Sequence, residues 1–100
     1  MDPDLPDLTI ADVVLSTAGR DAGKLFYVLE ADDTWLSLVN GKDRSIEKPK
    51  RKKSKHTNKV LRSDTRVANK LRLGDKVLNS ELRRDLAYLS RELQGNPIGG

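Results

Sequence analysis

Two segments of this 100-residue sequence combine residue types and spacings suited to binding a polyanion. The first is Gly19-Arg20-Asp21-Ala22-Gly23-Lys24. Glycines at both ends let the backbone turn tightly with positive φ and approach a bulky partner, and Arg20 and Lys24 then sit at the tip, within reach of phosphates. The alternative is an ordinary hairpin loop whose glycines serve geometry alone. A phosphate-binding P-loop is excluded, because its strand–GxxxxGK[ST]–helix context is missing.

The second segment is strongly basic. Seven of the thirteen residues from 44 to 56 are Lys or Arg. Such runs are usually solvated faces, but Pro49 extends this one and spreads its charges along a strip, which favours a nucleic-acid partner. The residues expected to contact it are Arg44, Lys48, Lys50, Arg51, Lys52, Lys53, Lys55 and His56.

Charge is segregated along the whole chain. Residues 1–40 carry eight acids and two bases, whereas residues 41–72 carry thirteen bases and three acids. Residues 73–100 carry four of each. One contiguous basic block indicates a polyanion partner more than general solubility. A membrane surface is the weaker candidate, because the basic run has no apolar helical face to insert.

The sequence contains no recognisable catalytic or metal-binding motif. His56 is the single histidine, and we identify no nucleophile–base pair in the sequence. Asp32-Asp33 supplies too few ligands for a metal ion. We therefore expect no enzyme activity, no metal and no cofactor, and His56 is interpreted as a hydrogen-bond partner of phosphate or backbone.

The composition predicts a cytoplasmic location. The sequence has no cysteine, which fits a reducing compartment. No apolar run approaches the roughly 20 residues needed to span a bilayer, so we expect no membrane contact. The acidic residues 1–7 are unlike a signal peptide.

Short apolar segments separated by turns predict a small barrel. Strands are expected over residues 10–15, 25–29 and 34–39. Asn40-Gly41 is a strong hairpin signal, so a return strand is expected from Lys42 to about Lys48, ending at Pro49. A last strand is expected near residues 56–61.

The C-terminal part has helical periodicity. Leucines at 82, 86, 89 and 93 form one stripe of a helix over residues 80–95. Ser80 suits its N-cap, and Gly95 with Pro97 suits its end. The stripe either packs on its own domain, dimerises or docks a protein through residues 82–93. Residues 63–74 form a short helix, capped by Ser63 or Asp64, or a loop.

Trp35 shares a strand face with Ser37 and Val39, while Leu36 and Leu38 share the other. If the leucines face the core, Trp35 is partly exposed and can stack on a base. The alternative is a tryptophan that covers one end of the barrel.

The turn, the Asn-Gly pair and the basic run, in this order, resemble the KOW motif. The likeness covers about residues 10–60 and is similar to small bacterial KOW-domain RNA-binding proteins, relatives of large-subunit ribosomal proteins of archaea and eukaryotes. It departs at Leu25-Phe26, where many KOW motifs carry glycine after the lysine. Residues after about 61 match no part of the family.

The resemblance implies a mostly β fold: an SH3-like KOW barrel over residues 8–60 that contains the basic segment. The periodicity, not the resemblance, adds a linker or short helix over 61–79 and an amphipathic helix over 80–95. The resemblance also implies non-catalytic binding of structured RNA, such as ribosomal RNA, in or near a ribosome, with Gly19 and Gly23 as structural turn residues. The alternative function is a protein-interaction adaptor of the translation or transcription machinery that uses the barrel and the leucine helix.

Overall fold

The computed structural model describes residues 8–94. Its five strands are β1 (Asp12–Ser16), β2 (Leu25–Ala31), β3 (Trp35–Val39), β4 (Lys50–Lys53) and β5 (Thr57–Arg62). A short 3-10 turn, η1 (Ser54–His56), joins β4 to β5, and the helices α1 (Arg66–Leu73) and α2 (Asn79–Gln94) follow. Across residues 8–94, no helix has the length and apolar character that crossing a bilayer requires.

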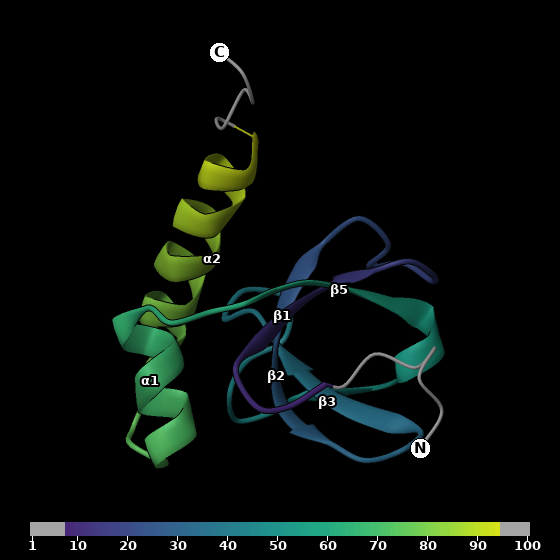
Figure 1. Ribbon diagram of the computed structural model, residues 1–100, viewed down its shortest axis with the longest axis horizontal. Coiled ribbons are helices and arrows are strands. Elements are labelled where there is room, and N and C mark those ends of the chain that lie inside the picture. The colour runs from purple at the N-terminus through teal and green to yellow at the C-terminus, as the bar shows by residue number, and fades with distance from the viewer. Residues whose placement is uncertain (1–7, 95–100) are drawn as a thin grey trace.

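All five strands belong to one antiparallel sheet with the order β4-β3-β2-β1-β5. The last strand therefore lies beside the first, and the sheet curls into a barrel-like shape with both helices on one side (Figure 1). A register shift between Val28 and Glu30 interrupts the pairing of β2 with β3, and such irregularities bend a strand.

Each face of the sheet carries an apolar cluster, because neighbouring residues of a strand point to opposite sides and both sets include apolar side chains. The inside of the curled sheet holds one apolar cluster: Val14, Phe26, Val28, Leu36 and Leu38. The outer face beneath the helices holds the other, which includes Val13, Tyr27, Val39, Val67, Leu71 and the first three leucines of α2. This double burial explains why β2 begins with consecutive apolar residues instead of an alternating pattern.

Four predicted strands are confirmed, with ends that differ by up to two residues. The predicted return strand over residues 42–48 is wrong. Residues 40–49 form a loop, and β4 begins only after Pro49. Asn40 organises this loop, because its Oδ1 accepts hydrogen bonds from the backbone N–H groups of Lys42 and Arg44, both 3.0 Å away.

Both C-terminal segments are helical. Residues 66–73 form α1. Its N-cap is Thr65, not the predicted Ser63 or Asp64, and the Thr65 hydroxyl accepts a hydrogen bond from Ala68 N. Helix α2 begins at Asn79, one residue before the predicted cap Ser80. The predicted end at Gly95 and Pro97 lies outside the described residues.

The leucine stripe of α2 packs on its own sheet. Leu82, Leu86 and Leu89 are buried in the cluster beneath the helices, whereas Leu93 is 46% exposed. Three of the four leucines therefore follow the first alternative, in which the stripe packs on its own domain. The face of residues 82–93 is thus largely occupied.

A partly buried polar cluster joins the helices to the sheet. The Tyr27 hydroxyl on β2 contacts the Asp85 carboxylate of α2 and lies 2.9 Å from Ser63 Oγ. Thr65 Oγ1 donates a second hydrogen bond to Asp85 Oδ2, at 2.8 Å. Burial, with the adjacent Asp85, raises the pKa of Tyr27 to about 12, so its hydroxyl keeps the proton that it donates.

Gly41 lets the loop and α2 approach each other closely. It is buried with φ of +76°, and a Cβ built there would lie 2.2 Å from the carbonyl oxygen of Asn79, the first residue of α2. On the same loop, Ile46 N donates to Asn79 Oδ1 at 2.8 Å. No side chain fits between the two backbones at Gly41.

Gly41→Ala should therefore displace the start of α2 and lower the free energy of unfolding by roughly 3 kcal/mol or more, because overpacking adds to the strain of positive φ. Gly74→Ala is the matched control: its φ is also +76°, but nothing lies within 4 Å of the added Cβ. It should cost only about 1 kcal/mol. Urea unfolding of both variants measures the difference, and equal losses would contradict the close packing at Gly41.

Candidate nucleic-acid interface

The short strand β4 divides the basic run between two faces of the sheet. It pairs with β3 so that Lys53 lies opposite Trp35, and Lys52 lies opposite Leu36. Arg51 and Lys50 lie opposite Ser37 and Leu38 in the same ladder. Because cross-strand partners share a face, Lys50 and Lys52 project with the interior leucines, whereas Arg51 and Lys53 project outward.

The two inward lysines converge on Asp21 in the glycine turn. Lys52 Nζ lies 2.8 Å from Asp21 Oδ1 and also donates to the carbonyl oxygen of Ala18 at 2.7 Å. Lys50 Nζ lies 3.4 Å from the other carboxylate oxygen, and Ser16 Oγ donates to Asp21 Oδ1 at 3.1 Å. Lys52 is only 7% exposed and Asp21 only 6%. This carboxylate ties the turn to β4.

Burial of Asp21 by itself would raise its pKa, but the hydrogen bonds and charges around it prevail. Hydrogen bonding from Lys52, Ser16 and Lys50, with the positive charge of Lys52, lowers the pKa of Asp21 from 3.8 to about 2. A carboxylate with a lowered pKa stabilises the folded state above its unfolded-state pKa. The contribution is therefore complete above about pH 4 and is lost as pH falls toward 2.

The outward residues surround the tryptophan. The Arg51 guanidinium carbon lies 4.9 Å from the centre of the Trp35 ring, and Lys53 Nζ lies 5.6 Å from it. Trp35 is partly exposed, while Leu36 and Leu38 are buried. Strand β3 therefore turns its leucines inward and leaves the Trp35 indole accessible to a binding partner, with the Arg51 and Lys53 cations beside the ring.

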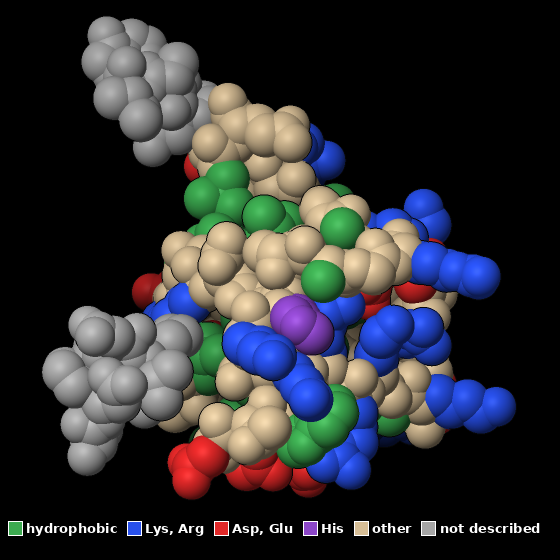
Figure 2. Space-filling model, turned by 90° about the vertical axis from the view of Figure 1, so that its right-hand side faces the viewer, with side chains coloured by type: hydrophobic (Ala, Val, Ile, Leu, Met, Phe, Trp, Pro, Cys, Tyr) green, Lys and Arg blue, Asp and Glu red, His purple; other side chains and the backbone are tan. Residues whose placement is uncertain are grey.

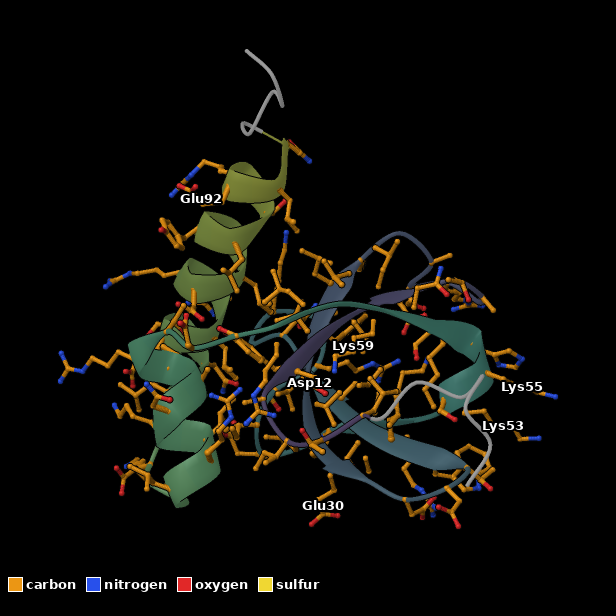
Figure 3. The ribbon with its side chains drawn as sticks, viewed as in Figure 1. Asp12, Glu30, Lys53, Lys55, Lys59 and Glu92 are labelled. Atoms are coloured by element: carbon orange, nitrogen blue, oxygen red, sulfur yellow. The ribbon has the colours of Figure 1, made fainter. Side chains whose placement is uncertain are left out.

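The 3-10 turn η1 adds to this surface. His56 O accepts a hydrogen bond from Thr17 N at 2.9 Å, and Ser54 N donates to Thr34 O, also at 2.9 Å. These bonds hold η1 between the glycine turn and the β2–β3 turn. Lys and Arg side chains gather around the single histidine on this face (Figure 2), and Lys53 and Lys55 point outward at this end of the sheet (Figure 3).

The remaining predicted residues have other surroundings. Arg20 is exposed on the glycine turn, and Lys24 is paired with Asp43 at 3.0 Å. Arg44 and Lys48 lie on the loop that packs against the start of α2. Both structural glycines have the predicted positive φ, +82° at Gly19 and +88° at Gly23.

One sequence expectation needs correction, and one structural residue was not predicted. Lys50 and Lys52 do not lie on an exposed strip with their neighbours, because alternation along β4 turns them toward Asp21. Asp21 itself was missed as a structural residue. The sequence feature that could have indicated its role is an acidic residue between two glycines, in a chain whose later segment is rich in Lys and Arg.

The basic face that results is defined by Arg51, Lys53, Lys55 and His56, with Trp35 at its edge. Within residues 8–94, none of these four basic residues forms an ion pair. No carboxylate of the described residues is in direct contact with these cations, although the pKa of Asp32, lowered chiefly by a hydrogen bond from the Trp35 backbone N–H, is lowered further by the charge of Arg51 nearby. Such a face can bind phosphates through the cations and an aromatic base through the indole.

Asp21→Asn should lower the free energy of unfolding by about 3 kcal/mol, because it leaves the buried Lys52 ammonium without a counter-charge. Adding Lys52→Met should recover part of that loss by removing the stranded charge. The control Asp43→Asn breaks the exposed pair with Lys24 and should leave the urea midpoint nearly unchanged. Equal midpoints for Asp21→Asn and Asp43→Asn, or strictly additive losses in the double variant, would contradict the buried anchor.

Comparison with known proteins gives no family assignment: no family model matches this chain, and no curated protein matches it. The likeness to KOW proteins over residues 10–60 therefore remains a sequence-based expectation. What the interface can do has to be inferred from the geometry of the described residues.

Proposed function

We propose that this protein binds structured RNA, without catalysis, through the basic face around Trp35. The observation that carries the proposal is the division of β4 between two faces. Its inward lysines, Lys50 and Lys52, both pair with Asp21, while Arg51 and Lys53 lie on the outer face next to Trp35. A partly exposed aromatic ring beside two cations is more typical of a nucleic-acid-binding surface than of a merely solvated basic strand.

Each part of the face has a role in this function. Lys53 and Lys55 supply phosphate contacts, whose release of counterions provides much of the affinity of such complexes. Trp35 supplies a platform on which an unpaired base can stack. His56 is bonded through its backbone to Thr17, so its position links the basic face to the glycine turn that carries Arg20.

We also propose that the barrel is of the SH3-like KOW type, with which the backbone is compatible. Positive φ at Gly19 and Gly23, a strand on either side of the turn, and a last strand beside the first are features expected of an SH3-like KOW barrel. Ribosomal RNA in the cytoplasm is the partner that this family would imply. In this proposal Lys50 and Lys52 position the turn and make no direct contact with RNA.

The alternative function, a protein-interaction adaptor, would need the leucine face of α2 as its binding surface. Leu82, Leu86 and Leu89 are buried against the protein's own sheet, so the leucine face cannot lie in a partner's groove while the helix stays docked. An apolar contact of that kind would persist at high salt, whereas RNA binding should weaken steeply.

Replacing Arg51, Lys53 and Lys55 together with Gln tests the proposal. The affinity for a short RNA hairpin with an unpaired loop should fall, and the slope of log affinity against log salt should shrink by about 2, since each phosphate contact contributes roughly 0.7–0.9. Emission of Trp35, the single tryptophan, reports both binding and folding.

A second triple variant provides the charge-matched control. Three exposed cations far from the basic face are used: Lys76, which precedes α2, and Arg84 and Arg91, which lie on it. Their replacement with Gln lowers the net charge by the same amount. This control should keep nearly all of the parent's slope. The proposed face is wrong if the two triple variants change the slope equally.

A further inference from the structure

Three outward residues form a row across the sheet. Glu30 on β2 pairs with Ser37 on β3, and Ser37 pairs with Arg51 on β4. Adjacent strands lie about 4.8 Å apart, so the row spans roughly 10 Å between its two ends. It places a carboxylate at one end, a hydroxyl in the middle and a guanidinium at the other end.

This row borders an open cavity of about 290 Å³, whose lining also includes Trp35 and Asp32. That volume is close to the lower end for sites that hold a small organic group. Asp32 fixes the tryptophan end of the cavity, because its Oδ1 accepts hydrogen bonds from Thr34 N and Trp35 N at 2.8 and 2.7 Å.

The two ends of the row are accessible to a partner. Glu30 and Arg51 are both exposed, and across residues 8–94 neither forms an ion pair. The Arg51 guanidinium lies beside the Trp35 ring, so a group bound there would contact both side chains. Glu30 points away from the sheet, on the side opposite the end of α2 marked by Glu92 (Figure 3). A phosphate would be repelled by Glu30 and Asp32, whereas a neutral group that offers hydrogen-bond donors to Glu30 and acceptors to Arg51 would match both ends of the row.

We propose that this cavity holds one unpaired guanine of the bound RNA, stacked beside Trp35 and read by Glu30 and Arg51. The proposal rests on the RNA-binding function proposed above and adds base specificity to it. Guanine carries two acceptors, N7 and O6, on one edge, where arginine is its commonest specific partner. Its adjacent edge carries two donors, N1–H and the 2-amino group, which suit an ionised carboxylate that only accepts.

The other bases do not offer this combination. Adenine pairs its N7 acceptor with an amino donor on the edge that Arg51 would contact, and it has no N1–H for Glu30. Cytosine and uracil are single rings that lack an N7 and expose less surface to the indole. The row of acceptor, hydroxyl and guanidinium therefore selects guanine by chemistry at both of its ends.

Hairpins that differ only in one loop nucleotide test the proposal, with Trp35 emission as the readout. The guanine hairpin should bind at least several-fold more tightly than the adenine hairpin, because one bidentate base contact discriminates by about 1–3 kcal/mol, or roughly 5- to 150-fold. Inosine, which lacks the 2-amino group, and 7-deazaguanine, which lacks N7, should each lose part of this preference. Glu30→Gln should abolish the difference between guanine and inosine, and Arg51→Lys should reduce that between guanine and 7-deazaguanine.

Glu92→Gln, on the exposed end of α2, is the matched control and should keep the guanine preference. Salt-sensitive binding that is equal for the guanine and adenine hairpins would overturn the guanine site and leave the RNA-binding function standing. A guanine preference that Glu30→Gln leaves intact would also overturn it. Absence of binding to every hairpin would overturn both proposals.

Discussion

The buried contact between Lys52 and Asp21 is the constraint on which the arrangement of this protein depends. An ammonium and a carboxylate that are both nearly inaccessible to solvent must stay paired, since either one alone would be a buried charge. Their pairing fixes the glycine turn against β4. Because side chains alternate along a strand, fixing Lys52 inward also sets Arg51 and Lys53 outward, beside Trp35. One ion pair thereby decides which charges reach solvent.

The helices complete the fold by covering another part of the outer face of the sheet, over Val13, Tyr27 and Val39. The first three leucines of the α2 stripe and the Tyr27–Asp85 contact attach them, and Gly41 allows the loop before β4 to lie directly on the start of α2. The same loop leads into β4, so helix packing and the basic face are connected through a short stretch of chain. Among the described residues, the surface around η1 and the outer side of β3 and β4 stays uncovered by the helices.

The sequence predicts the elements better than it predicts their partners. Apolar runs located four strands and the leucine period located α2, because both signals are local. The strand expected over 42–48 fails because Asn40-Gly41 serves a helix contact distant in sequence instead of a two-residue hairpin. The basic run looked like a single strip, since its division needs the register of β4, which the sequence alone does not give. The row of Glu30, Ser37 and Arg51 combines three separate strands and has no local signal at all.

The most direct test of the two-sided strand is acetylation of lysines, followed by mass spectrometry, with and without the RNA hairpin. Lys52 should react slowly in both states, because it is buried against Asp21. Lys53 and Lys55 should react readily in the free protein and become protected by RNA, whereas Lys76 should react equally in both states. Fast modification of Lys52 in the free protein, or RNA protection of Lys76 equal to that of Lys53, would contradict the account.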